Sequence, residues 1–271
     1  MTDQARLADL VETWHEAITE LVALARAIPE DQWDLPTDLE GWSVKDNVAH
    51  TAHLESVLAG GPEETLAVDT APHIKDIGGF YTEQGVLARR DKDMPALADE
   101  IERSAATRYA ELRADPPTDG KAAPPRTPAG IGWNNQTLLS NRPLDVWMHE
   151  QDVRRAIGVP GGYGTAAARH TIRQFGGALP MVLGKRVAPP AGTSVQLDVT
   201  DARQSWTAMI GEDGRAGIVE AVDAPTVRIR VSAEDFIVLA GGRRSLDVTS
   251  PAYDGDAALG HAVLASFCVT P

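Results

Sequence analysis

An aspartate and a histidine four residues apart, Asp145 and His149, have side chains of the kind that bind divalent metal ions. At this spacing in a helix, side chains lie on one face, roughly 6 Å apart at Cβ, so a carboxylate and an imidazole can share one ion. His50, in a separate predicted helix, can supply a third donor. Three protein donors leave one coordination position open, as a catalytic metal requires.

Two helical segments must position these donors. The first begins at Ser43, which forms a capping box with the acid three residues later, and its apolar stripe places His50 at the edge of the buried face. The second histidine of this helix, His53, points further from the stripe, which predicts a solvated or supporting side chain. In the other helix, Asp152 shares the face of His149 and is close enough to orient its imidazole.

Other residues leave simpler interpretations open. Many helices carry an Asp-x-x-x-His pair as an ordinary surface pair, and Trp42, just before the second helix, is predicted to be a packing anchor. Arg243 and Arg244 follow a Gly-Gly helix end, where they can bond helix carbonyls or bind a substrate carboxylate. No phosphate-binding loop, dinucleotide fingerprint or serine-hydrolase motif occurs, so nucleotide-dependent and serine-hydrolase functions lack support.

The pattern of residues 1–162 predicts a four-helix bundle. Apolar residues recur at helical spacing, and Pro, Gly and capping residues mark the helix ends. The four predicted helices span 4–28, 43–59, 94–114 and 143–157. Between them, 62–92 is predicted to be a long connection with one helical turn, and 115–133 a loop.

Residues 163–271 show a different pattern, which predicts an α+β domain. Apolar and polar residues alternate in three segments, as in strands with one buried face. The predicted strands cover 195–199, 206–210 and 227–231. The predicted helices cover 165–183, 232–239 and 256–267. We therefore expect helices on one face of a mostly antiparallel sheet.

The composition narrows the classes of function. A chain of 271 residues with 43% hydrophobic content is long enough for two packed domains, and its net charge of −14 argues against nucleic acid and anionic membranes as partners. No apolar run approaches the ~18 residues of a membrane span, and the N-terminal residues lack a secretory core, so we expect a cytoplasmic protein. The single cysteine, Cys268, excludes an internal disulfide and is predicted to be a buried small hydrophobe.

The segments around the candidate ligands resemble the DinB-like metalloenzyme superfamily. GWSVKDNVAHTAHLE resembles its second-helix motif, in which Gly-Trp-(Ser/Thr)-Val leads to a metal-binding histidine. LDVWMHEQDVRRAIGVP resembles its fourth-helix motif. The closing segment, LDVTSPAYDGDAALGHAVLASFCVTP, resembles the end of the sterol-carrier-protein-like C-terminal domain of the mycothiol-dependent maleylpyruvate isomerases. The resemblance covers nearly the whole chain, in the expected order.

The resemblance also implies roles for individual residues. His50, Asp145 and His149 match the metal ligands of the family, although the family usually carries glutamate at the position of Asp145. Asp152 matches the following acid of the motif. Arg243 lies where an arginine of the C-terminal domain helps to bind substrate in the isomerases. The resemblance implies a bound divalent metal, for which zinc is expected, and mycothiol as the thiol cosubstrate.

The implied function is a mycothiol-dependent isomerase or thiol S-transferase that acts on a small electrophile. A metal-bound thiolate adds to the electrophile; rotation and departure give isomerisation, whereas retention of the thiol gives S-transfer. Two alternatives stay open. One is a hydrolase that activates a metal-bound water and needs no thiol, and the other is a non-enzymatic protein that binds an apolar ligand in residues 163–271.

Overall fold

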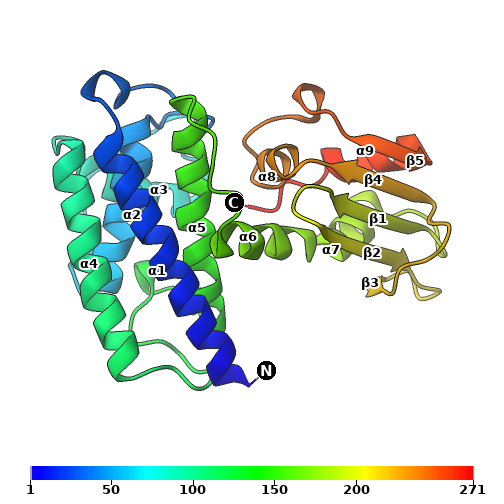
Figure 1. Cartoon of the computed structure of the whole chain (residues 1–271), viewed down its shortest axis with the longest axis horizontal. Coiled ribbons are helices and arrows are strands. Elements are labelled where there is room, and N and C mark those ends of the chain that lie inside the picture. Colours follow the sequence, from blue (N-terminus) through cyan, green and yellow to red (C-terminus); the bar gives the residue numbers. More distant parts are fainter. Residues whose placement is uncertain (1, 271) are drawn as a thin grey trace. The chain divides into compact units, whose positions relative to one another are not determined.

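The chain folds into two compact units, which are described separately. A computed structural model describes residues 2–270 (Figure 1). The division between the units falls between Ala168 and Arg169. The first unit is helical and the second combines helices with a small sheet, as the sequence predicts. The domain boundary that we predict after residue 162 stays a prediction.

Four long helices build the first unit (Figure 1). They are α1 (Asp3–Ala27), α2 (Val44–Leu58), α4 (Met94–Ala114) and α5 (Asn135–Ala156). Helix α1 contacts α4 and α5, and α2 contacts the same two helices, so the four close into a bundle in which α2 and α5 are neighbours. Apolar side chains from all four helices fill the centre, and the largest fully buried ones include Trp14, Leu21, Ile101 and Trp147.

Polar caps fix where these helices begin. Thr2, Ser43, Asp93 and Asn134 each accept a hydrogen bond from the backbone N–H three residues further on. At Ser43 the bond is reciprocal, and the predicted capping box is confirmed. Because caps and apolar stripes are local features, the helices predicted over 4–28, 43–59 and 94–114 lie within one residue of those observed.

Helix α5 begins eight residues earlier than predicted. We placed its start at Pro143 because proline favours a first turn, but Asn134 caps the helix and Pro143 lies inside it. Proline in a helix interior costs a backbone hydrogen bond. Here Pro143 is buried between flanking turns that also pack into the bundle, so tertiary contacts outweigh that loss.

A fifth helix, α3 (Ile77–Leu87), occupies the connection that we predicted to hold a single turn. Its glycines obscure the helical pattern, and Asp76 caps it. The helix packs on α2 so closely that a Cβ on Gly85 would lie 2.1 Å from the His53 ring. His53 is therefore fully buried, so the solvated alternative is wrong because α3 is not among the predicted helices, and the supporting role stays a prediction.

The second unit holds a five-stranded sheet in the order β3-β2-β1-β4-β5. The strands are β1 (Ser194–Val199), β2 (Gln204–Ile210), β3 (Ala216–Val219), β4 (Val227–Val231) and β5 (Ala252–Gly255). Neighbouring strands are antiparallel except for β1 and β4, which are parallel. The register pairs Leu197 with Ile229 and with Trp206, so the alternation that predicted these strands also aligns their apolar faces.

The predicted strands do not include β3 and β5, and the sheet is accompanied by helices. They are α6 (Ala166–Gly176), α7 (Leu179–Met181), the π-helical η3 (Val182–Val187), α8 (Ala233–Ala240) and α9 (Ala257–Ala265). The single helix predicted over 165–183 is broken after Gly176, where a Cβ would lie 2.4 Å from the Trp206 ring. Cys268 is exposed rather than buried; in this segment after α9 its neighbour Phe267 is the residue that packs into the core.

Three short 3-10 turns complete the described elements. They are η1 (Glu30–Gln32), η2 (Pro128–Gly130) and η4 (Leu246–Val248). Among residues 2–270, no helix combines the length and the apolar character that crossing a bilayer requires.

Candidate metal centre

His50, Asp145 and His149 meet where α2 and α5 pack together. One Asp145 oxygen lies 3.6 Å from His50 Nε2 and the other lies 3.7 Å from His149 Nε2. The three donor atoms lie within 4.8 Å of one another. Donors at 2.0–2.1 Å from a tetrahedral zinc ion lie about 3.3 Å apart, so a small closure of this cluster would suit Zn²⁺. Two imidazoles and one carboxylate are also a donor set that zinc accepts.

Both histidines are suited to bind a metal because they are buried beside a carboxylate. Their exposed fractions are 3% for His50 and 6% for His149. Burial lowers the pKa of His50, although Asp145 opposes the shift. The neutral imidazole is the form that ligates metal ions.

Arg142 holds Asp145, the carboxylate of the cluster, in place. Its Nη1 donates to Asp145 Oδ2 at 2.8 Å, one helical turn away on α5. Burial alone would raise the pKa of Asp145, but the Arg142 charge and the two histidine rings outweigh it and hold that pKa well below its usual range. Asp145 is therefore a carboxylate when the cluster is assembled.

A buried carboxylate, Glu55, holds Arg142 in turn. Glu55 Oε1 accepts hydrogen bonds from Arg142 Nε at 3.1 Å and Nη2 at 2.8 Å, and also from Trp14 Nε1 at 3.0 Å. Its other oxygen accepts from Arg108 Nη1 at 3.3 Å. Neither Glu55 nor Arg142 has an exposed side chain, so the two form a buried, hydrogen-bonded support for Asp145.

Asn47 determines which nitrogen of His149 faces the cluster. Asn47 Nδ2 donates to the Ser43 carbonyl at 2.9 Å and to Thr37 Oγ1 at 3.2 Å, so its oxygen must face His149. That oxygen lies 2.8 Å from His149 Nδ1. An amide oxygen only accepts, so Nδ1 carries the proton and Nε2 presents its lone pair to the cluster.

The position of Asp152 differs from what we expected of an orienting acid. Its Oδ2 lies 3.6 Å from His149 Nδ1, beyond hydrogen-bond length, whereas Asn47 makes the shorter contact. Arg155 pairs with Asp152 and, at 2.7 Å, with Asp38 of the loop before α2. A catalytic role for Asp152 stays a prediction.

Trp42 covers the two histidines. Its ring centre lies 5.0 Å from that of His50 and 5.8 Å from that of His149. The indole Nε1 donates to Glu83 Oε2 of α3 at 2.9 Å, and Arg90 pairs with the same carboxylate at 3.1 Å. The residue that we predicted to be a packing anchor therefore also forms part of the wall of the site.

Asn47, Glu55 and Arg142 were not among the predicted site residues. The contacts of Asn47 with His149 and of Glu55 with Arg142 join residues far apart in sequence, so no local pattern indicated them. Arg142 has one local partner, Asp145, three residues further on, but the predicted helix begins at Pro143. Arg243 belongs to the other unit, where its Nη1 donates to the Gly241 carbonyl at 2.7 Å. Its part in binding substrate stays a prediction.

His53 carries two buried ring nitrogens with no hydrogen-bond partner among the described residues. Its ring packs 5.2 Å from that of Tyr81, centre to centre. Burial lowers the pKa of His53 to about 3, with smaller contributions from Arg89 and His50. His53 is therefore neutral in the folded protein over the pH range in which an exposed histidine gains a proton.

Replacing His53 with leucine is expected to flatten the pH dependence of stability. Between about pH 3 and 6.5 the unfolded chain binds a proton at His53 that the folded chain does not, so the wild type loses stability as the pH falls. One proton contributes at most about 1.4 kcal/mol per pH unit. Urea unfolding of metal-free wild type and His53→Leu at about pH 4.5 and 6.5 measures the difference. If the free energy of unfolding changed equally with pH in the two proteins, the lowered pKa of His53 would be contradicted.

A helical bundle with a buried His–Asp–His cluster, followed by an α+β unit, defines a two-domain protein with a candidate metal centre. The family model described as "Mycothiol maleylpyruvate isomerase N-terminal domain" matches residues 14–154, and the model described as "MDMPI C-terminal domain" matches residues 170–262. The chain therefore belongs to the mycothiol-dependent maleylpyruvate isomerase family, and the resemblance noted from its motifs is confirmed.

Solved structures show the same fold. A crystal structure of the mycothiol-dependent maleylpyruvate isomerase is 16% identical, covers 93% of this chain and 95% of its own, and has a TM-score of 0.58. A crystal structure of a histidine-to-alanine mutant of that isomerase is 14% identical with the same coverage and a TM-score of 0.56. The comparison with curated proteins finds no match.

Proposed function

We propose that this chain is a mycothiol-dependent metalloenzyme that isomerises a small electrophilic substrate or transfers the thiol to it. The observation that carries the proposal is the convergence of His50, Asp145 and His149 within 4.8 Å, in a chain of this family. Zinc bound to these residues would supply the charge that stabilises the mycothiol thiolate at neutral pH. The two solved structures, titled as mycothiol-dependent maleylpyruvate isomerase, support the choice of thiol.

The residues of the chain have distinct tasks in this proposal. Asn47 keeps the Nε2 lone pair of His149 directed inward, and Arg142 keeps Asp145 charged and oriented. Trp42 shields the ligands from bulk water, which strengthens electrostatic interactions within the site. Arg243 would bind a carboxylate of the substrate.

Turnover with and without thiol tests the function. The zinc-loaded protein is incubated with mycothiol and a panel of electrophiles that includes maleylpyruvate, and products are followed by absorbance and mass spectrometry. We expect isomerised product or a thiol adduct only when mycothiol is present, and loss of both in His50→Ala. His15→Ala is the control, because His15 stacks on Tyr109 at 4.0 Å and is not part of the triad. Hydrolysis that persists without thiol would instead favour the hydrolase.

Removing the Asn47 amide is expected to weaken zinc binding by about 10- to 100-fold, the usual effect of losing a residue that orients a ligand. In Asn47→Leu, nothing at this position accepts the His149 Nδ1 proton, so the ring can take the tautomer that presents N–H to the metal. Competition titration with a zinc chelator measures the affinity. Asn47→Asp keeps the accepting oxygen and is expected to retain tight binding; equal weakening in both variants would assign Asn47 to packing alone.

A further inference from the structure

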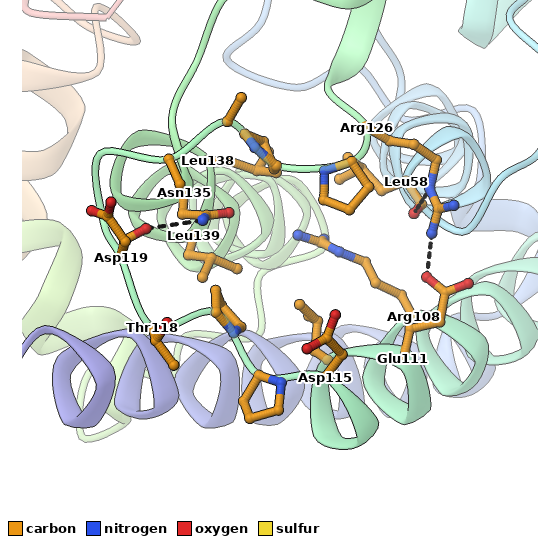
Figure 2. A pocket seen from close by; sticks show the side chains of 17 residues that line it. Leu58, Arg108, Glu111, Asp115, Thr118, Asp119, Arg126, Asn135, Leu138 and Leu139 are labelled. Atoms are coloured by element: carbon orange, nitrogen blue, oxygen red, sulfur yellow. Dashed lines mark hydrogen bonds and ion pairs between the residues drawn. The ribbon is translucent and has the colours of Figure 1, made fainter.

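A cavity of about 520 Å³ lies in the first unit, away from the histidine–aspartate cluster. The ends of α2, α4 and α5 and the proline-rich loop 115–126 surround it (Figure 2). Leu58 on its wall follows His50 by eight residues of α2, which is about 12 Å along the helix. Leu139 precedes His149 by ten residues of α5, about 15 Å. The cavity is therefore a separate site.

Arg108 is the polar group that reaches into the middle of this cavity (Figure 2). Its exposed fraction is 4%, and one guanidinium face lies over Trp14 at 4.5 Å. A guanidinium has five N–H donors. Within residues 2–270, Arg108 makes one hydrogen bond, from Nη1 to Glu55 at 3.3 Å. Most of its donors therefore face the cavity without a protein acceptor.

The charge of Arg108 is incompletely balanced. Burial lowers the pKa of Arg108 to about 10 even though Glu55 is close. Glu55 makes its shorter hydrogen bonds to Arg142, at 2.8 and 3.1 Å. An anion in the cavity would satisfy the open edge of Arg108, because a guanidinium binds a carboxylate through two parallel hydrogen bonds.

The rest of the lining limits the kind of anion. Leu58, Leu138 and Leu139 offer an apolar wall to the body of a ligand. The second arginine of the lining, Arg126, already pairs with Glu111 and donates to the Leu58 carbonyl at 2.9 Å. Two further acids, Asp115 and Asp119, also line the cavity; their repulsion of an anion grows with its charge and therefore disfavours multiply charged anions more than a monocarboxylate.

We propose that this cavity binds a small organic monocarboxylate, with its carboxylate on Arg108 and its apolar body against the leucine wall. Hexanoate is a suitable probe. In the full-length protein with labelled leucine methyl groups, it is expected to give saturable NMR shifts at Leu58, Leu138 and Leu139. Hexan-1-ol, which has the same apolar chain without the charge, is expected to bind at least about tenfold more weakly.

Substitution of the arginine gives the second arm of the test. Arg108→Met is expected to weaken hexanoate binding by at least about tenfold and to leave the hexan-1-ol affinity nearly unchanged. Arg113→Met, on the exposed side of the same helix where it pairs with Glu12, is the matched control and should bind hexanoate as the wild type does.

Four results would overturn the proposal, and three of them need only the wild type, so the test does not depend on the Arg108 variant folding. One is the absence of saturable shifts with millimolar hexanoate. Another is equal affinity of the wild type for hexanoate and hexan-1-ol. Unchanged hexanoate affinity in folded Arg108→Met is the third. Inorganic phosphate is expected to give no shifts at these leucines, and tighter binding of phosphate than of hexanoate would reject the monocarboxylate class.

Discussion

Replacing His149 with alanine is expected to remove about one equivalent of bound zinc and, with it, the thiol-dependent reaction. His149 supplies one of three donor atoms that lie within 4.8 Å of one another. Loss of a residue that merely orients a ligand costs 10- to 100-fold in metal affinity, so loss of the ligand itself should cost more than about 100-fold. Metal analysis after equilibrium dialysis and assay of thiol-dependent turnover measure the two effects.

The control for this prediction is His15→Ala, because His15 is a histidine of the same bundle that stacks on Tyr109. It should bind zinc as the wild type does. Circular dichroism must show that His149→Ala keeps its helices, since His149 is buried. If folded His149→Ala still bound one zinc ion tightly, the proposal that His50, Asp145 and His149 form a zinc site would be contradicted.

Replacing Glu55 with glutamine is expected to destabilise the protein by about 3–5 kcal/mol, the range found when one partner of a buried ion pair is removed. The carboxylate accepts hydrogen bonds from Arg142, Arg108 and Trp14, and its side chain has no exposed surface. Glutamine keeps the shape but leaves two buried guanidinium groups without the anion they share. Urea unfolding followed by circular dichroism measures the change in the free energy of unfolding.

Glu12→Gln is the matched comparison, because Glu12 pairs with Arg113 at 3.0 Å on the surface of the same unit. Exposed pairs contribute about 0–1 kcal/mol, so this variant should unfold close to the wild type. If Glu55→Gln lost as little unfolding free energy as Glu12→Gln, Arg142 and Arg108 would have found other partners when residue 55 is neutral. Glu55→Gln should also lower zinc affinity, because Arg142 would no longer be held beneath Asp145.

Features that depend on neighbours in the sequence were predictable. The capping box at Ser43 marked the start of α2, and alternation marked β1 and β4. The four-residue spacing of Asp145 and His149 was sufficient to place both on one helical face, and the motif around His50 indicated the family. These predictions succeeded because capping and periodicity are set by residues within one or two turns.

Features set by distant residues needed the structure. One of the two alternatives for His53, a solvated side chain, is wrong because the sequence does not reveal α3. The predicted start of α5 at Pro143 is wrong because local propensity carries no information about packing. The contacts that support the candidate metal centre span long separations: 102 residues from Asn47 to His149 and 87 from Glu55 to Arg142.

The sequence by itself thus determined the two-domain fold class, most helix limits and the residue types that can bind a metal. Only the tertiary structure decided that His50 meets Asp145 and His149, which tautomer Asn47 imposes on His149, and which buried charges stabilise the site. The physical reason is that hydrogen bonds and ion pairs depend on positions in space to within a fraction of an ångström. Local propensity and periodicity fix where a helix begins and which face it buries, but packing between helices sets those positions.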